Sequence, residues 1–159
     1  MSLFRLPPFA PRLRFTLLAG CVLLVGMASS PARAGGAEEP RKVTFKVLAS
    51  YPVDGAGAPP PAELQSLDGA SVVVTGYMLP LAYAKGRTRE FMLMRSQAAC
   101  CFGLTPKANE FVVVTTDAEE GVRATQDVPS TFTGVFRIRP VKMGDAVVQC
   151  FQIEKARPL

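Results

Sequence analysis

Six segments of the chain are rich in β-branched or aromatic residues, or alternate between apolar and polar side chains, and turn signals separate them. They are residues 43–48, 71–79, 88–95, 111–115, 128–138 and 146–155. One brief helix is expected at 61–67, where Leu64 and Leu67 share a face. Six short strands and one short helix predict an all-β fold, either a small OB-like Greek-key barrel or a half-open sandwich. Gly76 and Gly134, inside two of these strands, indicate bulges or bends.

The first 34 residues have the character of a signal peptide. Arginines precede an apolar run at 15–28, which is shorter than the roughly 20 residues that span a bilayer, and Ala32-Arg33-Ala34 is a cleavage motif. Cleavage after Ala34 would leave a flexible leader at 35–41 and a single β domain at 42–157 in the periplasm. Leu18-Ala19-Gly20-Cys21 offers an alternative lipoprotein motif, in which lipidation of Cys21 would tether the protein to a membrane.

The charge of the exported part differs from that of the whole chain. Four of the eighteen lysines and arginines lie within residues 1–34, and none of the thirteen acids does, so residues 35–159 carry a formal charge of only +1. This charge gives no basis for nucleic-acid binding, which calls for a strongly basic surface. The sequence contains no histidine, which excludes a histidine general base and every imidazole metal site.

The segment from Gln97 to Glu110 carries the unusual chemistry of the chain, because it places adjacent cysteines, Cys100 and Cys101, between two apolar strands. With Cys150, the exported part has an odd number of thiols in an oxidising compartment. The pair could form a strained vicinal disulfide and act as a redox switch. Alternatively, one of the two could pair with Cys150 and fasten the loop to the last strand.

A third interpretation is a soft metal site. Strand alternation places Phe91 and Leu93 on one face and Met92 and Met94 on the other, next to the loop. Thioethers together with the thiols of Cys100 and Cys101 suit monovalent copper, although methionine is also a common core filler. Zinc is a weaker fit, because its closed sites usually take four ligands and no histidine is present.

Four further residues of the loop are predicted to support it. They are Phe102, Gly103, Asn109 and Glu110. Asn109 is expected to cap the turn by bonding to its own backbone, and Glu110 to be a solvated carboxylate at the strand end, with ligand orientation as the alternative. The chain has no paired-carboxylate motif, nucleophile elbow or P-loop, so an enzymatic activity is not expected.

Three stretches, at 67–81, 91–114 and 128–138, resemble the exported bacterial domain-of-unknown-function family 3299, in the branch with a CCFG…NE segment. The matching residues are Gly76, Met78, Pro80, Cys100, Cys101, Phe102, Gly103, Pro106, Asn109 and Glu110. Two positions depart from the family pattern: Phe111 stands where tryptophan is expected, and Cys150 where relatives have an apolar residue. The second departure argues against a family-wide disulfide to Cys150 and favours Cys100 and Cys101 acting as a unit.

The resemblance implies a small periplasmic or lipoprotein-like β domain, some of whose relatives accompany metal-uptake or export systems, and it carries over no activity. Together with the thiols and thioethers described above, the resemblance predicts a non-enzymatic accessory domain. This domain would handle copper or zinc near a membrane transport system through the loop of Cys100 and Cys101. The alternatives are a thiol-redox protein with a vicinal disulfide and a purely structural interaction module.

Overall fold

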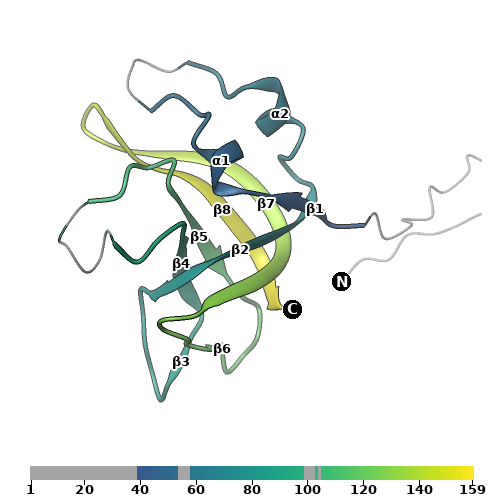
Figure 1. The fold of residues 1–159 in the computed structure, drawn as a ribbon, viewed down its shortest axis with the longest axis vertical. Helices are drawn as coiled ribbons and strands as arrows, with labels where there is room; N and C mark the ends of the chain where they lie inside the picture. The colour runs from purple at the N-terminus through teal and green to yellow at the C-terminus, as the bar shows by residue number, and fades with distance from the viewer. Residues whose placement is uncertain (1–38, 54–57, 99–102, 104) are drawn as a thin grey trace, which may run out of the picture. The chain divides into compact units, whose positions relative to one another are not determined.

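The structure is a computed structural model in which residues 39–53, 58–98, 103 and 105–159 are described. This part of the chain contains eight strands and two short helices (Figure 1). In chain order they are β1 (Arg41–Val43), α1 (Phe45–Leu48), α2 (Ala62–Gln65), β2 (Ser71–Pro80), β3 (Arg87–Thr88), β4 (Glu90–Met94), β5 (Phe111–Thr115), β6 (Val122–Arg123), β7 (Pro129–Met143) and β8 (Ala146–Pro158). No helix in these ranges has the length and apolar character needed to cross a membrane.

Six of the strands form one mixed sheet in the order β1-β2-β4-β5-β8-β7, while β3 and β6 pair separately. The pairs β1–β2 and β5–β8 are parallel, and the other pairs are antiparallel. The strand β2 also pairs with β7, with Ser71–Tyr77 against Pro129–Val135. Because β2 therefore has hydrogen-bonded neighbours at both ends of the strand order, the sheet curves into a partial ring. The predicted β class is therefore confirmed.

Gly76 lies where β2 passes from one partner to the other. The pairing with β7 runs unbroken from Ser71 to Tyr77, and the pairing with β4 begins at Tyr77. A Cβ atom at Gly76 would lie 2.8 Å from the Met94 carbonyl oxygen and 2.9 Å from the ring of Phe45. The glycine thus permits a close approach of α1 to the sheet, and the bulge considered for this position is not present.

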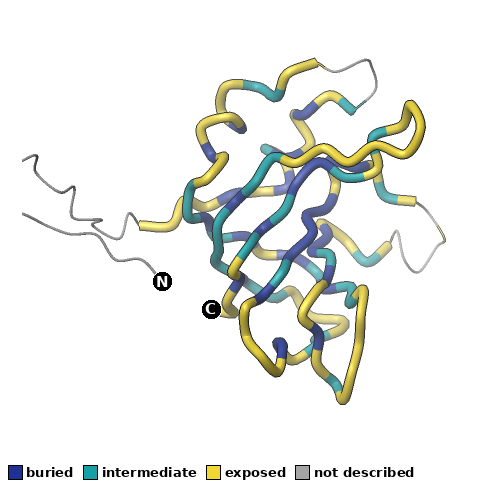
Figure 2. Tube along the Cα trace, turned by 180° about the vertical axis from the view of Figure 1, so that it is seen from behind, coloured by how far each residue is buried: buried dark blue, intermediate teal, exposed yellow. Residues whose placement is uncertain are grey.

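The main core lies on the inner face of the ring, where buried residues follow the strands (Figure 2). Aromatic side chains dominate it: the ring centroids of Phe91 and Phe132 lie 4.8 Å apart, and those of Phe136 and Phe151 lie 5.5 Å apart. A second cluster, formed by Met94, Phe111 and Val113, lies on the opposite face of β4 and β5. The strand β5 is consequently buried on both faces, as its continuous apolar run predicted.

The prediction of a strand at 43–48 was wrong, because only Val43 belongs to a strand and residues 45–48 form α1. Phe45 and Leu48 are both buried, at the spacing of one helical turn, so tertiary packing overrides the local alternation. The helix predicted at 61–67 is confirmed as α2, which makes two short helices instead of one. The two-residue strands β3 and β6 were not predicted, and Val122 of β6 is buried.

Gly134 lies within a register shift between β7 and β8, which confirms the irregularity predicted at this position, and it is also closely packed. A Cβ atom there would lie 2.5 Å from Cγ2 of Ile153 and 2.7 Å from the carbonyl oxygen of Glu154. We expect Gly134→Ala to lower the free energy of unfolding by about 2–3 kcal/mol through overpacking, measured by urea denaturation.

Gly144→Ala serves as the comparison, since nothing lies within 4 Å of an added Cβ atom and only its φ of +62° is unfavourable. It should cost roughly 1 kcal/mol. A Gly134→Ala protein as stable as the unmodified one would contradict the close packing of β7 on β8.

Candidate functional site

The cysteine-bearing segment connects β4 to β5. Its described residues are 95–98, 103 and 105–110, whereas Cys100, Cys101 and Phe102 lie outside the described residues, as do Cys21 and the predicted cleavage position after Ala34. Gly103 is exposed and has a φ of +65°, a left-handed conformation that glycine adopts without penalty. The site is therefore built from the residues at which this segment leaves and rejoins the sheet.

The two methionines of β4 occupy the face that strand alternation predicted. Phe91 and Leu93 lie in the main core, while Met94 belongs to the second cluster and Met92 packs against it. Met94 is only 3% exposed and stands opposite Phe111 of β5 on one side and Tyr77 of β2 on the other. Its thioether thus lies at the end of β4, directly before the cysteine-bearing segment.

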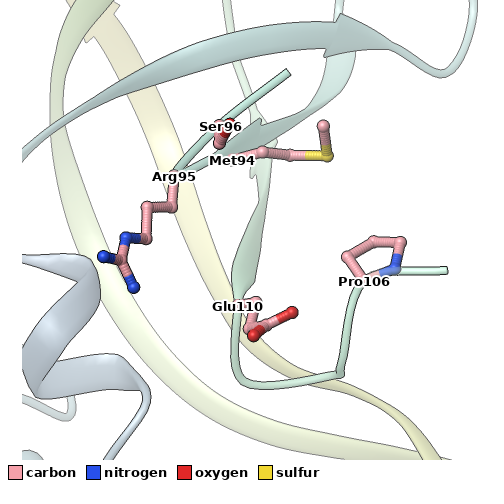
Figure 3. A pocket seen from close by; sticks show the side chains of 5 residues that line it. All are labelled: Met94, Arg95, Ser96, Pro106 and Glu110. Carbon is pink, nitrogen blue, oxygen red and sulfur yellow. The ribbon is translucent and has the colours of Figure 1, made fainter. Parts of the chain in front are cut away.

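An open hollow of about 310 Å³ lies at this end of β4, and we call it the loop hollow (Figure 3). It is lined by Met94, Arg95, Ser96, Pro106 and Glu110. In Figure 3 the side chains of Met94 and Glu110 extend toward the side on which Pro106 lies, whereas Arg95 extends the other way. Since these residues come from both ends of the segment, the chain carrying Cys100 and Cys101 begins and ends on the wall of the loop hollow.

Glu110 holds the turn through which the segment rejoins β5. The Lys107 backbone N–H donates to Oε2 of Glu110 over 3.0 Å, and the Glu110 N–H donates to the Lys107 carbonyl over 2.9 Å. The side chain remains exposed at the start of β5, as predicted, but one of its oxygens is committed to this turn. Its role within the described residues is to shape the exit from the segment.

Asn109 ties the same turn to the backbone that follows α1. Its Nδ2 donates to the carbonyl oxygens of Tyr51, at 2.7 Å, and Ala49, at 3.2 Å. The predicted local cap was therefore wrong, because the amide bonds to backbone that lies almost sixty residues earlier. Its Oδ1 is buried and has no hydrogen-bond partner among the described residues. We call this contact the Asn109 clasp.

Cys150 is a free thiol in the main core and is 0% exposed. The disulfide considered between Cys150 and Cys100 or Cys101 is not formed in this structure. Burial raises the pKa of Cys150 from its ordinary value of 9.0 to about 11. Burial also raises the pKa of Tyr51, with a smaller contribution from the charge of Cys150. A thiol that is buried and hard to ionise is inert, so Cys150 does not belong to the candidate site.

Sequence reasoning missed several features of this site. The described residues bring together no three side chains of cysteine, aspartate or glutamate around a common point, so a metal site here would need Cys100 and Cys101. Arg95, Ser96 and Pro106 were not among the predicted site residues, although their positions at the two ends of the segment would have identified them. The Asn109 clasp had no local signal, because its partners are backbone carbonyls distant in sequence.

Comparison with known proteins supports a family assignment. The model of the family described as "Protein of unknown function (DUF3299)" matches residues 58–156. A crystal structure of a DUF3299 family protein from Pseudomonas aeruginosa PAO1 is similar in fold, with a TM-score of 0.53 and 22% sequence identity. The similarity covers 77% of this chain and 97% of that one. A search of the curated proteins finds no match.

The Asn109 clasp can be tested by removing the amide. We expect Asn109→Ala to lower the free energy of unfolding by about 2 kcal/mol, because two acceptors, the carbonyls of Ala49 and Tyr51, lose a buried donor. Denaturant unfolding measures the change. Gln126→Ala, at an exposed position, should change stability by less than about 0.5 kcal/mol. Equal stability of the two variants would contradict the clasp.

The buried thiol predicts a specific pH dependence. Because the folded state holds the proton of Cys150 more tightly, its contribution to stability is fully present below about pH 9 and is lost as the pH rises through about 11. Urea unfolding at several pH values should show a shallower alkaline decline for Cys150→Ala than for the unmodified protein. Parallel curves would contradict the raised pKa, and Tyr51→Phe separates out the contribution of the tyrosine.

Proposed function

This chain belongs to the DUF3299 family, and we propose that it is a periplasmic accessory domain without enzymatic activity that binds a soft metal ion through the loop of Cys100 and Cys101. The metal that suits the ligands best is monovalent copper. The observation that carries the proposal is the position of Met94, which lines the loop hollow at the end of β4, directly before the segment whose sequence contains the two cysteines.

The ligand chemistry favours copper over zinc. Two thiolates and one thioether form an all-sulfur set, which soft monovalent copper prefers. Zinc takes thiolates, imidazoles and carboxylates, usually four of them, and this chain has no histidine. Glu110 is the carboxylate that lines the loop hollow, but one of its oxygens already accepts the Lys107 N–H. The described environment therefore supplies a sulfur ligand more readily than an oxygen ligand.

The supports of the loop suit a binding site. Met94 is held in the second cluster, Glu110 closes the turn at 107–110, and the Asn109 clasp fixes that turn to the chain beyond α1. Ligands mounted on rigid elements lose less conformational freedom when a metal binds. The flanks of the segment are thus held in place before any metal arrives.

The finer assignment of the fold is an OB-type Greek-key barrel. The hydrogen-bonded order β2-β4-β5-β8-β7-β2, with one parallel pair between β5 and β8, supports it. The signal-like residues 1–34 support export to the periplasm, with lipidation at Cys21 as the alternative. A component of a membrane transport system is the partner that the family resemblance suggests.

One observation also favours a thiol-redox function as a second candidate. Because Cys150 is a free thiol buried in the main core, Cys100 and Cys101 are left as possible disulfide partners of each other within the exported part. A vicinal disulfide is strained and therefore easily reduced. Mass spectrometry of the unreduced protein distinguishes it, since a loss of two hydrogens confined to the peptide with Cys100 and Cys101 supports redox chemistry.

The metal proposal is tested by titrating the reduced protein, residues 35–159, with cuprous ion against a chromogenic chelator. Replacing both Cys100 and Cys101 by serine should abolish stoichiometric binding, while the circular dichroism spectrum stays that of the folded domain. Met94→Leu should weaken binding about tenfold, which corresponds to ~1.4 kcal/mol, because the thioether is lost while the side-chain volume is kept.

Met92→Leu is the matched control, because Met92 lies on the same strand and face but does not line the loop hollow. It should leave the copper affinity unchanged. One copper ion bound equally tightly by the double serine variant would exclude the site. Equal copper affinities of Met94→Leu and Met92→Leu would show that Met94 is not a ligand of the copper site.

A further inference from the structure

A second hollow, of about 190 Å³, is also lined by Met94, and we call it the Asp127 hollow. Tyr77, Leu79 and Met94 contribute to its apolar wall. Gln97, Gln126 and Asp127 contribute the polar wall. Because Met94 lines both hollows, an occupant of the second would lie beside the cysteine-bearing segment.

The polar side chains of this hollow are available to a ligand. The side chains of Gln97, Gln126 and Asp127 form no hydrogen bond or ion pair with any other residue that the structure describes. Asp127 and Gln126 are exposed, and Gln97 is half-buried. Two amides and one carboxylate therefore offer donors, acceptors and a single negative charge next to an apolar wall.

The backbone supports Asp127 in this place. Its φ of +65° lies in the left-handed region, which aspartate and asparagine tolerate better than other non-glycine residues. The pairing of Pro129 with Tyr77 begins two residues later and anchors the chain to β2. The carboxylate is thus carried on a tight turn immediately before a long strand.

Two residues close in sequence to the lining of the hollow have exposed apolar side chains. Val128, next to Asp127, is 55% exposed, and Leu81, two residues beyond Leu79 on β2, is 51% exposed. A hollow of this size is smaller than the roughly 300 Å³ at which small-molecule sites begin, and holds about one side chain. A small molecule would leave Val128 and Leu81 in water, whereas a polypeptide would cover them.

We propose that the Asp127 hollow is a docking site for an extended segment of a partner protein, which inserts one leucine-sized apolar side chain and places an adjacent lysine or arginine against Asp127. The assignment rests on the apolar wall, on the unpaired carboxylate that complements a basic side chain, and on the exposed Val128 and Leu81. It goes beyond metal binding and holds whether or not the cysteine loop takes copper.

The test uses the metal-free protein and short blocked peptides, with binding followed by backbone amide shifts in NMR at low salt. Acetyl-Gly-Lys-Leu-Gly-amide should shift Tyr77, Leu79, Gln97 and Gln126. Peptides with glutamate in place of the lysine, or with glycine in place of the leucine, should bind more weakly. Asp127→Asn should weaken binding of the first peptide about threefold, because it removes one exposed charge pair and fits the left-handed backbone.

Asp117→Asn is the matched control, because Asp117 is an exposed acid that lines a different hollow, with Lys155 and Arg157. It should leave peptide binding unchanged. Equal binding of all three peptides, shifts centred on other residues, or no binding by any of them would overturn the proposal. Tighter binding of n-butylamine than of the first peptide would overturn the proposal and indicate that the hollow binds a small amine. Shifts of the same residues that depend on protein concentration, without peptide, would overturn it in favour of a second copy of this chain.

Discussion

The structure depends on β2 being shared among three strands. Its first half lies between β1 and β7, its second half pairs with β4, and Tyr77 takes part in both of the antiparallel pairings. Where β2 changes from one set of partner strands to the next, the backbones of several elements must lie close together. Gly76 occupies that point, with the ring of Phe45 and the carbonyl of Met94 within contact distance of a Cβ atom. The order of pairing therefore sets where the end of β4 can lie.

The same constraint gives the candidate site its position. Because β4 must meet β2 from Tyr77 onwards, its last residue, Met94, is placed between Tyr77 and Phe111, on the face opposite the main core. The cysteine-bearing segment leaves from this end and returns to β5 beside it. Met94 lines both the loop hollow and the Asp127 hollow. One side chain thus serves two surfaces with different polar linings.

The sequence predicted those features that depend on neighbours along the chain. Alternation in 88–95 separated Phe91 and Leu93 from Met92 and Met94, and the continuous run at 111–115 indicated a strand covered on both faces. Prediction from the sequence failed where contacts between residues far apart in the chain decide the local structure. Phe45 and Leu48 form a helical turn because both are buried against the sheet, and Asn109 bonds to carbonyls that only the fold brings near. No pattern along the chain encodes either arrangement.

The position of Cys150 bears directly on the chemistry of the loop. Its thiol is fully buried in the main core and burial raises its pKa to about 11, so thiolate exchange with another thiol would require the core to open. That separation leaves Cys100 and Cys101 to each other, to a ligand or to another molecule. The described residues at which their segment leaves β4 and rejoins β5 are held by the second cluster, by Glu110 and by the Asn109 clasp. Cys150 is therefore a packing residue of the main core.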